Sequence, residues 1–135
     1  MKNEKGFTLI ELLASLLIVS VIIILLISIL LNGINATNRN TTNQRLQQEA
    51  NYIEQVIRKE YLVSIFLKQN PIELKVDGNS LLMDNQEISS GYKYTLIETS
   101  NQKLLIPRND VVSLKLKISK DNQSYTLNTK FSKID

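Results

Sequence analysis

Apolar residues follow three different patterns along this chain, and each pattern predicts a different element. Residues 12–31 are twenty consecutive residues without a charge, and seventeen of them are apolar. At 1.5 Å per residue, a helix of this length spans about 30 Å, the thickness of the hydrocarbon core of a bilayer. The segment therefore predicts a membrane-spanning helix. Its three polar residues are Ser15, Ser20 and Ser28, whose hydroxyls can bond back to the carbonyl four residues earlier.

The second pattern begins beyond residue 43. Apolar residues recur there at spacings of three and four, which predicts an amphipathic helix that ends near Leu62 or Ile65. Its apolar stripe consists of Leu46, Ala50, Ile53, Ile57 and Tyr61, whereas Gln47, Gln48, Glu54 and Arg58 face elsewhere. The connecting residues 32–43 are rich in asparagine and threonine, which have low helix propensity. We expect either a bend for packing there or a membrane-proximal linker.

The third pattern follows Pro71, where the period changes to two, as in β-strands. Strands are expected at residues 72–76, 81–83, 92–99, 112–118 and 124–131, and residues 104–106 form a short apolar piece that ends at Pro107. Turns are expected at residues 77–80, where the sequence contains Asp-Gly, and at Asp121-Asn122. The last two strands alternate apolar and polar residues, so one face of the sheet should be covered by the helix. The predicted fold class is α+β: a long amino-terminal helix packed on a small antiparallel β-sheet.

Composition removes several function classes. The chain has 135 residues, a formal net charge of +3, no cysteine and no histidine. Disulfides, thiolate metal sites and the commonest general base are therefore excluded. The acidic residues of the head are scattered, and Asp77-Gly78-Asn79 lacks the repeated ligand spacing of a calcium loop. We expect no enzymatic activity, no metal and no cofactor.

Lysines on the predicted sheet could form a binding surface for a polyanion. Lys115, Lys117 and Lys130 are expected on its exposed face. Such lysines can bind DNA, but they also keep a wet face soluble and edge strands apart. Because no aromatic platform accompanies them, direct DNA contact is not expected.

One acidic residue, Glu11, stands at the start of the apolar run. Burying an ionised carboxylate at hydrocarbon depth costs several kcal/mol, whereas its interaction with the helix dipole stabilises it by only about 0.3–1 kcal/mol. A counter-charge is therefore expected. The candidates are Lys5 and the amino group that a cut between Gly6 and Phe7 would create.

The residues around Glu11, Lys5-Gly6-Phe7-Thr8-Leu9-Ile10-Glu11-Leu12-Leu13, resemble the processing and methylation motif of type IV pilins and pseudopilins. The resemblance covers about the first thirty residues. It implies that a prepilin peptidase cleaves between Gly6 and Phe7 and methylates the new amino terminus of Phe7. It also implies that Glu11 pairs with the amino terminus of a neighbouring subunit in a filament. The pilin fold agrees with the predicted helix and sheet.

The resemblance also implies an organisation. The expected divisions are a leader peptide at 1–6, a transmembrane and filament-core helix at 7–31, a weak stretch with an amphipathic helix at 32–65, and an antiparallel β head at 66–135. Lys2 and Lys5 before the span favour an amino terminus inside the cell and a head outside, because positive residues tend to stay cytoplasmic. The implied partners are other pilins or pseudopilins, the prepilin peptidase, a platform membrane protein, an assembly ATPase, and membrane lipid before assembly.

Two departures from many pilins narrow the prediction. The apolar segment lacks their helix-weakening glycine and proline, with Ser28 where the proline is often found, and the head lacks their carboxyl-terminal disulfide loop. We expect a minor pilin or pseudopilin, and the absence of cysteine favours a competence-type DNA-uptake pseudopilus of a Gram-positive bacterium. The alternatives are a type II secretion pseudopilin and a single-pass anchored binding domain that never polymerises. A cleaved signal peptide fits less well, because its apolar core is shorter.

Overall fold

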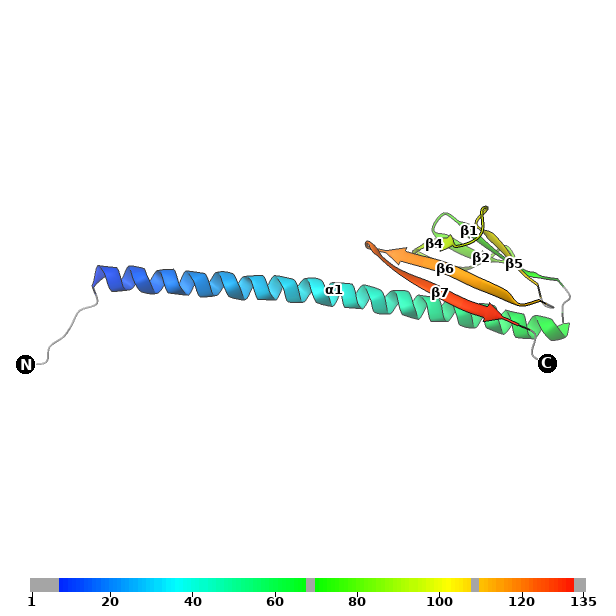
Figure 1. The fold of residues 1–135 in the computed structure, drawn as a ribbon, viewed down its shortest axis with the longest axis horizontal. Coiled ribbons are helices and arrows are strands. Elements are labelled where there is room, and N and C mark those ends of the chain that lie inside the picture. The colour runs from blue at the N-terminus through cyan, green and yellow to red at the C-terminus, as the bar shows by residue number, and fades with distance from the viewer. Residues whose placement is uncertain (1–7, 68–69, 108–109, 133–135) are drawn as a thin grey trace, which may run out of the picture. The chain divides into compact units, whose positions relative to one another are not determined.

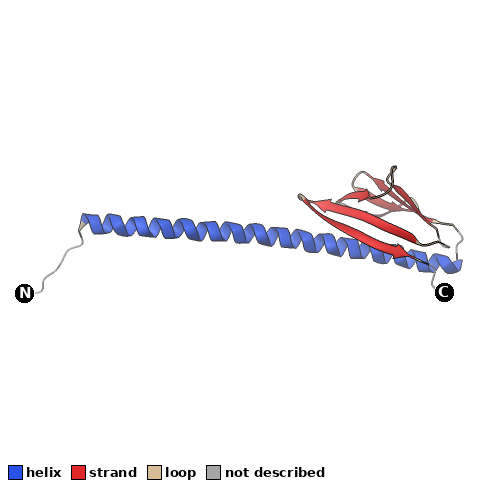
Figure 2. Ribbon diagram, viewed as in Figure 1, coloured by secondary structure: helices blue, strands red, loops and turns tan. Residues whose placement is uncertain are grey.

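The computed structural model describes residues 8–67, 70–107 and 110–132 (Figure 1). These residues form one helix and seven strands, drawn by type in Figure 2. In chain order the elements are α1 (Leu9–Leu67), β1 (Ile72–Asp77), β2 (Ser80–Met83), β3 (Gln86–Ser90), β4 (Lys93–Leu96), β5 (Lys103–Ile106), β6 (Val112–Lys120) and β7 (Gln123–Phe131). The chain comprises two compact units, Met1–Arg39 and Asn40–Asp135.

The described part of the first unit is the apolar part of α1. An 18-residue window of this helix has a mean hydropathy of 3.2 and none of it is buried within the chain, so the helix is apolar and long enough to cross a membrane. Ser20 and Ser28 donate to the carbonyl oxygens of Leu16 and Ile24, four residues earlier, as predicted. Ser15 differs, because its hydroxyl donates to the carbonyl three residues earlier.

The stretch at residues 32–43 is helical throughout, so the expected weak point does not interrupt α1. Extending an existing helix avoids the cost of forming a new helical nucleus, so residues with a propensity penalty of up to about 1 kcal/mol can still be included. Within the stretch, the hydroxyl of Thr37 donates a hydrogen bond to the Gly33 carbonyl at 2.9 Å. The low helix propensity of asparagine and threonine is therefore overcome locally.

The second unit contains the amphipathic part of α1, which extends to Leu67, two residues beyond the predicted end. The predicted stripe is confirmed: its five members are all buried, at 0–3% exposure. They pack in one core cluster with the inward-facing residues of the strands. These are Ile72, Leu74, Leu81, Tyr94, Leu96, Ile106, Leu114, Leu116, Ile118, Leu127 and Phe131.

The strands form two antiparallel sheets, where the sequence predicted one. A four-stranded sheet has the order β3-β2-β1-β5, and a three-stranded sheet has the order β4-β6-β7. Strand β3 was not predicted, because its sequence QEISS contains a single apolar residue and shows no alternation. It pairs with β2 at the edge of its sheet, where one partner strand suffices.

The hairpin turns follow from residues that accept a positive φ. Gly78 has a φ of 60° in the two-residue turn between Asp77 and Ser80, as the Asp-Gly signal predicted. Asp121 and Asn122, at 51° and 61°, form the predicted turn between β6 and β7. Aspartate and asparagine are the non-glycine residues that adopt this conformation most readily.

Candidate functional site

The first turn of α1 contains a reciprocal set of hydrogen bonds between Thr8 and Glu11. The backbone N–H and the Oγ1 hydroxyl of Thr8 each donate to Oε2 of Glu11, both at 2.9 Å. The N–H of Glu11 lies 3.4 Å from Thr8 Oγ1 and 3.1 Å from the Thr8 carbonyl oxygen. This arrangement is a capping box, in which the first and fourth residues satisfy each other's polar groups.

The capping box determines where the Glu11 carboxylate points. Both bonds from Thr8 reach the same oxygen, and Oε1 accepts no hydrogen bond from a described residue. The carboxylate is thereby turned toward the amino-terminal end of the helix, with one oxygen available to a further donor. Sequence analysis missed this role of Thr8, although the Thr-x-x-Glu spacing before an apolar run signals it.

The surroundings of this site are apolar. Leu9 and Ile10, which lie between the two capping residues, are 79% and 75% exposed. Within the described residues, Glu11 forms no ion pair. The predicted counter-charges, Lys5 and the amino group of Phe7, lie outside the described residues, and so does the predicted cleavage residue Gly6. Their roles, and the pairing of Glu11 with a neighbouring subunit, stay predictions.

In the second unit, polar side chains join the helix to the strands. Glu54, expected to face away from the sheet, instead accepts hydrogen bonds at Oε1 from Arg58 Nη2 at 2.7 Å and from Thr129 Oγ1 at 2.9 Å. These two bonds lower the pKa of the Glu54 carboxyl. Arg58 also lies over the ring of Phe131, 5.7 Å from its centroid. Both residues therefore belong to the boundary between α1 and β7.

A second polar cluster connects α1 to both sheets. Ser89 on β3 donates to Oε1 of Glu49, and the hydroxyls of Ser89 and Tyr94 lie 2.7 Å apart. Burial raises the pKa of Tyr94 to about 12. Glu49, Ser89 and Tyr94 come from α1, β3 and β4, so the cluster links these three elements. We therefore interpret it as a contact that stabilises the fold.

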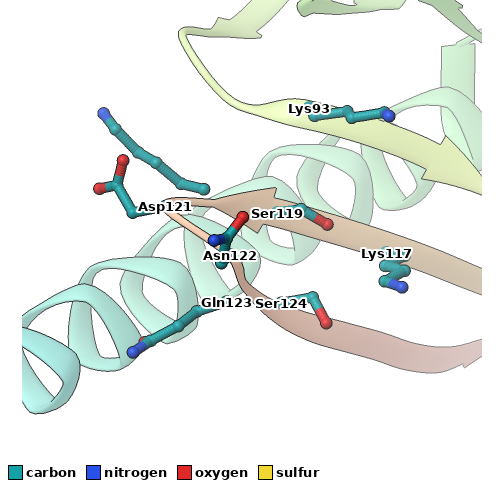
Figure 3. A pocket seen from close by; sticks show the side chains of 8 residues that line it. Lys93, Lys117, Ser119, Asp121, Asn122, Gln123 and Ser124 are labelled. Atoms are coloured by element: carbon teal, nitrogen blue, oxygen red, sulfur yellow. The ribbon is translucent and has the colours of Figure 1, made fainter.

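The predicted exposed lysines lie on one face of the three-stranded sheet, as expected from the β6–β7 register. Lys115 forms an ion pair with Glu98, and β4 adds Lys93 to the same face. At one end of this face is an open hollow of about 410 Å³ (Figure 3). It is lined by Lys93, Lys117, Ser119, Lys120, Asp121, Asn122, Gln123 and Ser124.

Two other sequence interpretations concern metals and turns. Asp77, Gly78 and Asn79 form a hairpin turn, as predicted. Among the residues that the structure describes, no three histidine, cysteine, aspartate or glutamate side chains are grouped so that they could hold a metal ion.

Comparison with protein-family models finds a match at the amino terminus of the chain. The family model described as the prokaryotic N-terminal methylation motif matches residues 1–31. Comparisons with curated proteins and with solved structures gave no match. The matched segment contains Gly6 and Phe7 as well as the Thr8–Glu11 capping box.

Proposed function

Since the chain carries the N-terminal methylation motif of the type IV pilin and pseudopilin family, we propose that it is a structural subunit of a pilus-like filament. The observation that carries this proposal is the matched motif at residues 1–31, and the long helix that begins within it and packs against antiparallel sheets agrees with the proposal. The family consists of structural proteins, and we assign no enzymatic activity to this member.

The first proposed step is processing at the membrane. A prepilin peptidase hydrolyses the peptide bond between Gly6 and Phe7 and releases residues 1–6. Methylation of the new amino terminus of Phe7 leaves the amine positively charged. Residues 7–31 then form the membrane-spanning and filament-core helix, residues 32–65 connect it to the head, and residues 66–135 supply most of the head. Lys2 and Lys5 support an orientation with the amino terminus inside the cell and the head outside.

The second proposed step is assembly through Glu11. In a water-poor filament core, a cation and a carboxylate compensate each other's lost hydration only when they are paired with good geometry. The Thr8 bonds hold one oxygen of Glu11, and Oε1 is available to the amino terminus of a neighbouring subunit. Such a pair fixes the axial register between two subunits, because a displaced register would leave two unpaired charges in the core.

The finer assignment is a minor pilin or pseudopilin in a Gram-positive competence pseudopilus. It is supported by the absence of cysteine from the whole sequence and by the small head. The proposed partners are sibling pilins, the prepilin peptidase, a platform membrane protein and, through that platform, an assembly ATPase. A type II secretion pseudopilin is the second candidate, since the same motif and helix would serve it.

Replacing Glu11 tests the proposed assembly step. Glu11→Gln retains the shape of the side chain and removes its charge. Incorporation of the full chain into filaments, measured in sheared and pelleted material from the native host, should fall at least about tenfold, because the partner amine remains unpaired. Membrane insertion should be unchanged. Normal incorporation of Glu11→Gln would instead support a plain single-pass anchor with a glutamate at the membrane interface.

A further inference from the structure

The hollow at the β6–β7 turn carries an excess of positive charge. Its charged lining residues are Lys93, Lys117, Lys120 and Asp121, so three lysines and one aspartate leave a net charge of +2. All four are exposed, and none forms an ion pair with a described residue. Figure 3 shows the Asp121 side chain at the tip of the turn, directed away from the amines of Lys93 and Lys117. The aspartate therefore does not neutralise this lysine hollow.

The lysine hollow lies at the end of the head where α1 enters it. Strand β7 runs in the same direction as α1, because Thr129 contacts Glu54 and Phe131 contacts Tyr61 farther along both elements. From Thr129 back to Gln123, a strand covers about 20 Å, which equals about 13 residues of helix. Gln123 is therefore level with the first residues of the second unit. Figure 1 shows the β6–β7 turn at this end of the head.

This end of the head is also the end closest along the chain to the membrane. The predicted span ends at Leu31, and Thr42 is the first described residue of α1 that is not exposed. As a helix, residues 32–41 rise by about 15 Å. Lipid headgroups occupy roughly 5–8 Å beyond the hydrocarbon core, and the Debye length of about 8 Å covers most of the remaining distance. Arg39 and Arg45 add positive charge, and no acidic residue accompanies them in this part of the chain.

A tyrosine borders the lysine hollow. The ring of Tyr92 is half-buried, with Nζ of Lys120 4.9 Å from its centroid and the ring of Tyr94 at 6.3 Å. Tyrosine and lysine both suit a membrane interface, because each combines an apolar body with a polar end. Single-stranded nucleic acids instead stack their bases on open aromatic faces. Since Lys120 and Tyr94 already contact the Tyr92 ring, the surroundings of the hollow favour a lipid surface over a nucleic acid.

We propose that the lysine hollow binds anionic phospholipid headgroups of the membrane that holds the chain, before the subunit enters a filament. The inference rests on the membrane insertion included in the proposed function and is independent of filament assembly. Lysine ammonium groups are flexible point charges that pair with phosphates, and each basic residue near an anionic surface adds to the attraction. The contact holds the head against the membrane, and it has to break when the subunit leaves the bilayer.

A fluorescent reporter can test the contact, because the natural chain has no cysteine. Ser124→Cys places a thiol of nearly the same size at an exposed position that lines the hollow. The full chain is labelled there and reconstituted in vesicles of phosphatidylcholine alone, or of equal parts of phosphatidylcholine and phosphatidylglycerol. Both kinds of vesicle contain a trace of lipid with a nitroxide quencher on its headgroup. Val111→Cys is the matched control, exposed and about 30 Å from Lys120 along β6.

We expect quenching of the Ser124→Cys reporter to be at least about threefold stronger in the vesicles with phosphatidylglycerol, because the attraction requires anionic lipid. Lys93→Gln together with Lys117→Gln should reduce the quenching to the level in phosphatidylcholine alone. Lys59→Gln together with Lys130→Gln removes the same charge at the opposite end of the head and should leave the quenching unchanged. High salt should weaken it, since exposed charges are screened.

The outcomes separate this inference from the proposed function. Equal quenching in the two kinds of vesicle, or equal effects of the two double variants, would overturn the lipid contact while the filament function stands. The contact is also wrong if the chain binds single-stranded DNA through Lys93 and Lys117 and the reporter ignores lipid charge. If alkaline carbonate extracts the full chain from the vesicles, membrane insertion itself fails, and the inference and the proposed function fail together.

Discussion

Thr129 on β7 donates a 2.9 Å hydrogen bond to Oε1 of Glu54 on α1, and Arg58 donates to the same oxygen at 2.7 Å. The carboxylate of Glu54 therefore joins the helix to the last strand of the head. A charged acceptor with two donors is stronger than a neutral one, and both bonds favour its ionised form.

Glu54→Gln should destabilise the head at pH 7, because the neutral amide accepts weaker hydrogen bonds than the carboxylate. The expected loss is only about 1 kcal/mol, because the Arg58 side chain is half exposed and solvent screens the ion pair. The pKa of Glu54 is lowered in the folded chain, so its contribution is complete above the ordinary glutamate pKa of about 4.3 and is lost as pH falls through the lower, folded value. Urea unfolding of the full chain in detergent should show that the free energies of unfolding of the wild-type chain and Glu54→Gln converge below that pH range. A gap that stays constant between pH 7 and pH 3 would exclude this account.

Tyr94→Phe should destabilise the head by about 1–2 kcal/mol, because it removes the hydroxyl that contacts Ser89 inside the cluster with Glu49. Tyr52→Phe is the matched control, since Tyr52 is 51% exposed, and its effect should stay within about 0.5 kcal/mol. Absorbance titration should show one tyrosine that ionises near pH 12 and disappears in Tyr94→Phe. Equal effects of the two substitutions would show that the buried cluster contributes nothing.

Thr8→Val should weaken assembly, because the valine keeps the shape of threonine and loses the hydroxyl that holds Glu11. Loss of an N-cap costs about 1 kcal/mol, so incorporation into filaments should fall about fivefold. Thr8→Ser should restore it. Incorporation is counted only among chains whose amino terminus has been processed, which separates assembly from cleavage. If Thr8→Val assembles as well as Thr8→Ser, the capping box does not orient Glu11.

Glycine-to-alanine substitutions should have opposite effects at two positions. Gly78 has a φ of 60°, where a Cβ costs about 1–2 kcal/mol, so Gly78→Ala should destabilise the β1–β2 hairpin. Gly33 is helical, and a Cβ there meets no atom within 4 Å. Gly33→Ala should therefore stabilise α1 locally by up to about 1 kcal/mol. Amide hydrogen exchange of the full chain in micelles measures both, and slower exchange near residue 78 in Gly78→Ala would contradict the turn assignment.

The elements with strong periodicity were predictable from sequence. The stripe from Leu46 to Tyr61 and the alternation in β6 and β7 both place apolar residues on one side, and burial follows directly from that pattern. The Asp-Gly signal at residue 78 and the Asp-Asn turn at residue 121 also specify their conformations locally. These features depend on residues that are close in the sequence, so they can be predicted from the sequence alone.

The features that could not be predicted from the sequence depend on contacts between residues far apart along the chain, or on small differences in free energy. β3 is held by pairing with β2, not by its own residues, and the division into two sheets is not encoded in any one strand. Glu54 looked like a surface residue because its partner Thr129 lies 75 residues away. Residues 32–43 looked weak because propensity was considered without the continuing helix on both sides. Glu11 was found by its charge, but its partner Thr8 was overlooked.

The central claim, that this chain is a processed filament subunit, is tested most directly by mass spectrometry of its amino-terminal peptide. The chain is isolated from the membrane of its native host, without a tag at the amino terminus, and a host strain lacking prepilin peptidase is the control. The account predicts a peptide that begins at Phe7 and carries one added methyl group, absent from the control strain. A chain that begins at Met1 in cells with active peptidase would contradict the account.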